Sequence, residues 1–90
     1  MARPRTALAR SSQHDALGRA VKQLIAQKPG LTLDTVVRDS GLDEKQIGTY
    51  IRGQGNPTYS TLIKLCKGLH VSLQELTSRA EALHKEHYGH

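Results

Sequence analysis

The chain has 90 residues and a formal net charge of +5, from 13 Lys and Arg against 8 Asp and Glu. A chain this short forms one domain around one core, and its basic balance favours polyanionic partners, with nucleic acid first among them. A single cysteine excludes an intramolecular disulfide and a Cys-rich zinc site. No apolar run is long enough for a membrane span, so we expect a soluble, cytoplasmic protein without a membrane partner.

The first 13 residues form a basic segment that contains no acidic residue. Arg3, Arg5 and Arg10 provide its charge, Pro4 interrupts it, and no sustained apolar period runs through it. We therefore expect a flexible, disordered arm over residues 1–13. Its arginines suit a narrow, A·T-rich minor groove, whose negative potential attracts Arg. Two other interpretations stay open, a solubilising tail and an organellar transit peptide.

The rest of the chain has the apolar spacing of helices, and no segment has the period of a strand. Ser, Thr or Asp residues that can cap a helix stand at several of the expected starts, and Gly or Pro stands at the expected ends. The sequence therefore predicts an all-α domain over residues 14–77, followed by a helical extension and tail over residues 78–90. The five predicted helices run from Asp15 to the Pro29-Gly30 break, from Thr32 to Gly41, from Asp43 to Gly53, from about Thr58 to Leu69, and from Ser72 onward.

Short motifs occur in a characteristic order between residues 17 and 76. Gly41 lies in a turn between two short helices, Ile47 lies inside the second of them, and Arg52-Gly53 and Asn56-Pro57 follow it. In this order the sequence resembles the phage Cro and repressor family, the lambda-repressor-like (XRE) helix-turn-helix proteins. The resemblance implies a five-helix fold and a sequence-specific DNA-binding transcriptional regulator, such as a repressor, that inserts helix 43–52 into the major groove.

The resemblance also implies which side chains meet double-stranded DNA. In this family the N-terminal part of the second motif helix reads base edges, and neighbouring residues contact phosphates. Leu33 is a departure, since the family often has a polar, phosphate-contacting residue at that position. On this sequence the implied base-reading residues are Asp43, Glu44, Lys45 and Thr49, and the implied phosphate-contacting residues are Thr32, Arg52, Gln54 and Asn56.

The charge of the motif leaves a second interpretation open. Residues 33–46 carry four acids against Arg38 and Lys45, a net charge of −2 on the surface expected to face DNA. Asp43 and Glu44 can complement the dipole of their helix, and Glu44 can accept a hydrogen bond from a cytosine amine. Otherwise the chain is a protein-interaction adaptor, or an antitoxin-like accessory subunit, that binds a protein partner through its last helix.

The last predicted helix carries an apolar seam suited to a second copy of the chain. Leu76, Ala80 and Leu83 follow one another at spacings of four and three residues. We therefore expect a homodimer on palindromic half-sites, unless this helix packs wholly within one chain. Histidines recur every third residue near the chain end, but we expect them at the surface, with no metal and no cofactor. No motif for catalysis appears, so we expect no enzymatic activity.

Overall fold

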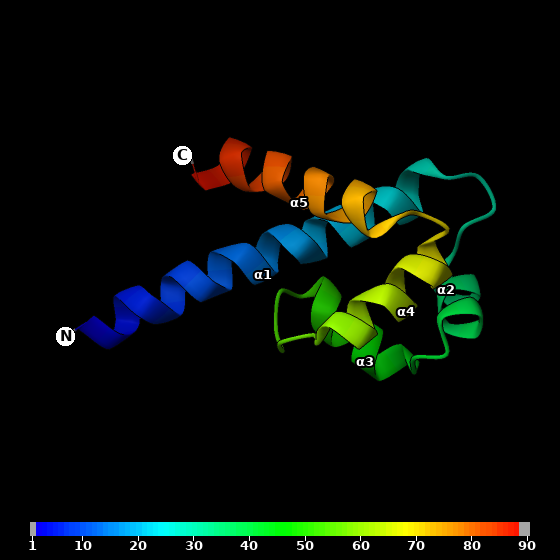
Figure 1. Ribbon diagram of the computed structural model, residues 1–90, viewed down its shortest axis with the longest axis horizontal. Helices are drawn as coiled ribbons and strands as arrows, with labels where there is room; N and C mark the ends of the chain where they lie inside the picture. The colour runs from blue at the N-terminus through cyan, green and yellow to red at the C-terminus, as the bar shows by residue number, and fades with distance from the viewer. Residues whose placement is uncertain (1, 89–90) are drawn as a thin grey trace.

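The structure is a computed structural model that describes the backbone of residues 2–88 and the side chains of residues 12–88. This part of the chain contains no strand, and the predicted all-α class is confirmed. None of the described helices has both the length and the apolar character needed to cross a membrane. The helices are α1 (Ala2–Gln27), α2 (Leu33–Ser40), α3 (Glu44–Ile51), α4 (Tyr59–Leu69) and α5 (Leu73–Tyr88), as Figure 1 shows.

The first helix begins much earlier than the sequence predicted. We expected an irregular arm over residues 1–13 and a helix from Asp15, whereas the helical backbone begins at Ala2. Most of residues 2–13 are Ala, Arg, Leu or Gln, which form helices readily. Pro4 falls in the first turn, where a missing N–H costs no intrahelical hydrogen bond. The side chains of residues 2–11, the three arginines of the expected arm among them, lie outside the described residues.

The last helix packs along the first, which corrects the predicted dimer seam. Leu76 and Leu83 are buried in the core of their own chain, and Ala80 packs against the same cluster. Arg79 strengthens this pairing, because its Nη1 donates to the side-chain oxygens of two α1 glutamines at 2.7 and 2.9 Å. The seam is therefore already covered by α1 and is not free to meet a second copy.

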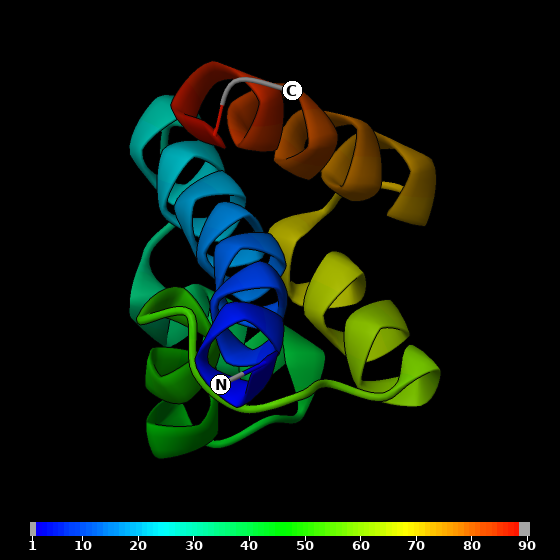
Figure 2. The same cartoon turned by 90° about the vertical axis from the view of Figure 1, so that its left-hand side faces the viewer.

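The core lies where α1 meets the four shorter helices. In Figure 2, α1 runs through the middle of the molecule, with α5 on one side of it and α2, α3 and α4 on the other. The core is aliphatic, as a chain without Phe or Trp requires. Burial of these side chains supplies the main driving force for folding. The largest fully buried side chains are those of Val21, Leu24, Val36, Ile47, Leu65, Leu69 and Leu76.

Candidate nucleic-acid interface

A three-residue turn joins α2 to α3 and sets the angle between them. Gly41 ends α2 with φ 79°, a left-handed conformation that residues with a β-carbon rarely adopt. Leu42 is buried in the corner, and its N–H donates to the Ser40 hydroxyl at 3.1 Å. The Asp43 carboxylate begins α3 by accepting from the N–H of Gln46 at 2.7 Å. The chain therefore bends at Gly41, and the predicted helix-turn-helix geometry is confirmed.

One face of α3 holds the helix in the fold while its first turn stays accessible. Ile47 is fully buried, and Ile51 packs against the edge of the same core. By contrast, Asp43, Glu44 and Lys45 are all exposed. The beginning of α3 is thus anchored from behind and open in front, as a helix that enters a groove must be.

The residues predicted to read bases lie together at this open end. Thr49 follows Lys45 by one turn and is partly exposed, and its hydroxyl donates to the Lys45 carbonyl oxygen at 3.0 Å. Arg52, one turn further, donates from Nη2 to the Thr49 hydroxyl at 3.5 Å. The structure therefore places a predicted base-reading side chain beside a predicted phosphate-contacting one.

Gln46 is a further member of this surface that was not predicted from the sequence. Its side chain is partly exposed in the first turn of α3, and its Nε2 donates to the Tyr50 hydroxyl oxygen at 3.2 Å. The sequence signal for this pair is its spacing of four residues, which brings side chains together on a helix. The bond holds the Gln46 amide beside the predicted base-reading residues.

The residues predicted to contact phosphates are all exposed, but they come from two places. Thr32 caps α2, and its hydroxyl accepts from the N–H three residues later at 3.3 Å. Arg52, Gln54 and Asn56 follow α3, and the Gln54 N–H donates to the Thr49 carbonyl oxygen at 3.0 Å. The loop over residues 53–57 is therefore folded back onto the end of α3, beside Thr49.

The backbone of α1 supports this loop and the end of α3. A β-carbon at Gly18 would overlap the carbonyl oxygen of Ile51 and lie 2.6 Å from that of Tyr50. Gly53 has φ 77°, and a β-carbon there would lie 2.9 Å from the Cα of Asp15. Backbone contacts with α1 thus fix where α3 ends and where the 53–57 loop begins.

The charges of the motif are unevenly distributed along the chain. Residues 47–74 contain no acid, and Arg52, Lys64 and Lys67 are exposed there. The acids of the motif lie before this stretch, at both ends of α2 and at the start of α3. A polyanion is therefore attracted by the residues after the exposed turn of α3 and repelled by part of that turn.

One acid of the motif has a structural role at the corner between α2 and α4. Asp39 accepts from the Arg38 Nε at 3.2 Å and is hydrogen-bonded to the His70 Nε2 at 3.1 Å. The hydrogen bond from Arg38, together with that from His70, lowers the pKa of the Asp39 carboxyl below its ordinary value. His70 caps α4 with φ 59°, a left-handed conformation that is uncommon for residues other than glycine, and its side chain contacts Asp39.

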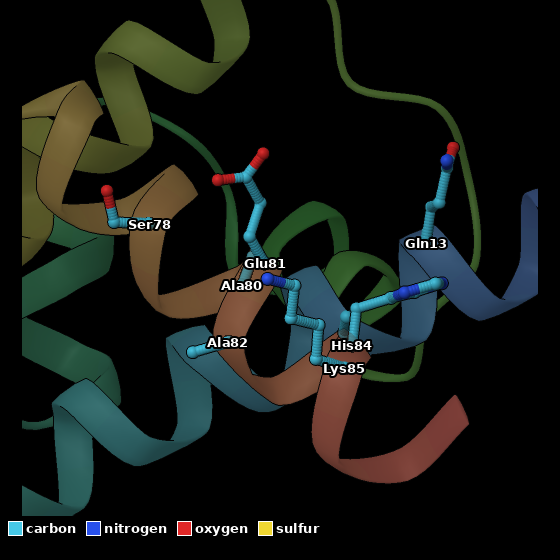
Figure 3. Close-up of a pocket in the computed structure, with 8 residues that line it drawn as sticks. Gln13, Ser78, Ala80, Glu81, Ala82, His84 and Lys85 are labelled. Carbon is cyan, nitrogen blue, oxygen red and sulfur yellow. The ribbon is translucent and has the colours of Figure 1, made fainter. Parts of the chain in front are cut away.

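A hollow between α1 and α5 is separate from the motif helices. It has a volume of about 630 Å³ and is lined only by residues of α1 and α5. Gln13 and Glu81 extend toward the same open side of it, and His84 reaches toward Gln13 (Figure 3). Within the described part of the chain, no three His, Cys, Asp or Glu side chains are grouped so that they could hold a metal ion.

Comparison with known proteins agrees with this geometry. A family model described as helix-turn-helix matches residues 21–76, which include α2, the turn and α3. No curated protein and no solved structure matches the chain. The matched segment covers more than half of the sequence and contains the bend at Gly41. The chain therefore belongs to the lambda-repressor-like helix-turn-helix family of DNA-binding regulators.

Proposed function

We propose that this protein is a sequence-specific transcriptional regulator that inserts α3 into the major groove of duplex DNA. The observation that supports this most strongly is the accessible first turn of α3, where Glu44 and Lys45 are exposed while Ile47 anchors the helix in the core. A helix with its side chains is about 10–12 Å across, and the major groove of B-DNA is about 12 Å wide. Asp43 and Thr49 complete the set that faces base edges.

The chemistry of these side chains suits a limited set of bases. Lys45 can donate to the O6 and N7 atoms of guanine, and Glu44 can accept from the N4 amine of cytosine. The Thr49 hydroxyl can donate or accept, and its methyl group suits the thymine methyl. The acidic residues at the start of α3 therefore favour sites rich in G·C pairs on this part of the operator.

The contacts that hold the protein on DNA come from residues around the reading turn. Arg52 provides a cation, and Gln54 and Asn56 provide neutral amide donors next to it. Thr32 stands at the start of α2, where backbone N–H groups suit a phosphate oxygen. Together these residues set the orientation of α3 without reading sequence.

Two further parts of the proposal concern the whole assembly. The basic residues Arg3, Arg5 and Arg10 contact the minor groove or the phosphates beside the main site. Two copies bind as a homodimer on half-sites about one helical turn apart, through a surface other than the buried leucines of α5.

A protein-interaction adaptor or antitoxin-like accessory subunit is the competing function. The exposed carboxylates of Asp43 and Glu44 favour it, because their negative charges repel the phosphates of DNA. The outer face of α5 would then bind the protein partner. The two functions predict different effects of salt on the affinity for DNA, and this difference offers a direct test.

Selection of duplexes from a random pool, followed by titration at several salt concentrations, tests the proposal. A regulator yields one enriched motif, and its logarithmic affinity falls with the logarithm of the salt concentration, with a slope of about −0.9 for each phosphate neutralised. We expect Arg52→Gln to reduce that slope by about 0.9. Lys85→Gln is the matched control, because it removes one exposed cation from α5 instead.

The outcomes of this experiment separate the two functions. An enriched motif, with a reduced slope in Arg52→Gln and an unchanged slope in the Lys85→Gln control, supports insertion of α3 beside Arg52. No enrichment and a flat salt dependence would rule out the regulator and leave the adaptor function.

A further inference from the structure

The last turn of α5 is hydrogen-bonded to α1 at two places. The Tyr88 hydroxyl donates to the Asp15 carboxylate at 2.9 Å, and the Arg19 Nε donates to the same oxygen at 2.8 Å. One turn earlier, the His84 Nε2 is hydrogen-bonded to the Ser12 hydroxyl at 3.0 Å. We call these five side chains the α1–α5 clamp. Partners on both helices thus hold the C-terminal turn of α5 in place.

Electrostatics strengthens the clamp at Asp15. The hydrogen bond from Arg19, together with that from Tyr88, lowers the pKa of the Asp15 carboxyl below its ordinary value. The same carboxylate raises the pKa of the Tyr88 hydroxyl. At neutral pH the bond therefore joins a neutral phenol to an ionised carboxylate, which makes it stronger than a bond between neutral groups.

Asp15 also touches the proposed DNA surface. The Cα of Asp15 lies so close to Gly53 that a β-carbon there would be 2.9 Å away. Gly18, one turn further along α1, is in similar contact with the carbonyl oxygens that end α3. The turn of α1 that the clamp holds is therefore also the turn on which the 53–57 loop rests.

None of the clamp residues belongs to the segment that matches the helix-turn-helix family. The match covers residues 21–76, whereas the clamp uses Ser12, Asp15 and Arg19 before it and His84 and Tyr88 after it. The clamp is thus an addition to the matched motif and is made by the extensions at both ends of the chain.

We propose that Tyr88 and Asp15 are positioning residues that hold the 53–57 loop and the end of α3 in the conformation that binds DNA. This inference rests on the proposed function, since it assigns a role toward the same DNA surface. A loop that is ordered before binding loses less conformational entropy when it meets the phosphates. Loss of the Tyr88–Asp15 bond loosens α1 where it supports the loop, so affinity falls although neither residue touches DNA.

The test compares the wild-type protein with Tyr88→Phe, Asp15→Ala and the double variant. Tyr88→Phe removes only the hydroxyl, and we expect duplex affinity to fall about three- to tenfold, the effect of one such hydrogen bond. Because both substitutions remove the same hydrogen bond, the affinity of the double variant for the duplex is no lower than that of the single variant with the lower affinity. Additive losses in the double variant would overturn the proposal.

Amide hydrogen exchange in the free protein provides a second measurement that does not depend on DNA. The N–H groups of Gly53 and Gln54 donate to the Tyr50 and Thr49 carbonyl oxygens, both at 3.0 Å. We expect these two amides to exchange several-fold faster in Tyr88→Phe. The Val71 amide, bonded to the Cys66 carbonyl oxygen at 3.1 Å in the turn before α5, is the internal control and stays unchanged.

The two measurements distinguish failure of this inference from failure of the proposed function. If the wild-type protein binds no duplex, the regulator is ruled out, and exchange at Gly53 still decides whether the clamp orders the loop. Faster exchange at Val71 as well would show general destabilisation and overturn the positioning role. Unchanged affinity in Tyr88→Phe would overturn it too, whatever the exchange rates.

Discussion

Two glycines inside helices show that the atoms packed against a residue decide whether a β-carbon can be accommodated there. Gly18 in α1 and Gly48 in α3 have the same intrinsic cost, because glycine destabilises a helix by about 0.5–1 kcal/mol relative to alanine. A β-carbon at Gly48 would meet only the flexible end of the Arg52 side chain, at 3.2 Å. At Gly18 it would overlap the backbone carbonyl of Ile51. The close approach of α1 to α3 therefore requires glycine at position 18 and not at position 48.

We expect Gly18→Ala to lower the free energy of unfolding by about 1–3 kcal/mol, the usual cost of overpacking. The neighbouring backbone carbonyl cannot rotate aside as a side chain can. Gly48→Ala is the matched control and raises the free energy of unfolding by about 0.5–1 kcal/mol. Urea unfolding followed by circular dichroism measures both changes. If both variants were stabilised, α1 would not support α3 as closely as the structure shows.

At the scale of the element, the first turn of α3 meets two requirements at once. Its acidic residues begin the helix, and they also lie on the surface proposed to face DNA. The Asp43 carboxylate satisfies the Gln46 N–H, one of the groups at a helix start that have no partner within the helix. The negative charge also complements the helix dipole. Part of the acidity of this segment therefore has a structural cause and does not argue against a DNA partner.

We expect Asp43→Ala to lower the free energy of unfolding by about 1 kcal/mol, because the Gln46 N–H loses its acceptor. Asp43→Ser keeps a side-chain oxygen at the same place, and its stability stays within a few tenths of a kcal/mol of the wild type. Thermal unfolding at neutral pH measures both variants. Equal losses in the two variants would show that the charge, and not the hydrogen bond, stabilises the start of α3.

Signals between residues close in sequence predicted the starts of α2, α3 and α5 correctly. Thr32 and Asp43 cap α2 and α3 as expected, and the Ser72 hydroxyl accepts from the Glu75 N–H at 3.0 Å at the start of α5. The bend at Gly41 was predictable for the same reason, because a left-handed turn depends on one residue and its neighbours. The exposure of the first turn of α3 follows once Ile47 is recognised as its anchor.

Contacts between distant parts of the chain could not be predicted in this way. A seam with spacings of three and four fits a helix of a second copy as well as a helix of the same chain. In the structure α5 packs along α1 of the same chain, and Leu76 and Leu83 are buried there. The pairing of Asp15 with Tyr88 gave no signal either, since neither residue lies in a recognisable motif. The bend at Gly41 and the exposed turn of α3 were therefore predictable, whereas the support behind them was not.

At the scale of the whole molecule, α1 makes the protein elongated, with extents of 43 × 23 × 18 Å. Figure 1 shows the N-terminal half of α1 extending past the other helices. This half contains three arginines and no acid, whereas residues 33–46 have a net charge of −2. The attraction that brings a polyanion to the acidic motif must therefore come from elsewhere in the chain. The extension of α1 is a concentrated source of it.

We expect removal of residues 2–10 to weaken binding to the selected duplex and to reduce the salt slope by up to about 2.7, or about 0.9 for each arginine that meets a phosphate. The substitution of Arg3, Arg5 and Arg10 together by Gln is the matched control. It removes the charge but keeps a residue that favours helices, so it reduces the slope equally if charge is the cause. A loss of affinity in the deletion alone would show that the helical segment, and not its charge, contributes to binding. Unchanged affinity and slope in both variants would mean that the extension of α1 does not contact DNA. Arg52 and the 53–57 loop would then have to hold the acidic motif on DNA without a contribution from the N-terminal end of the chain.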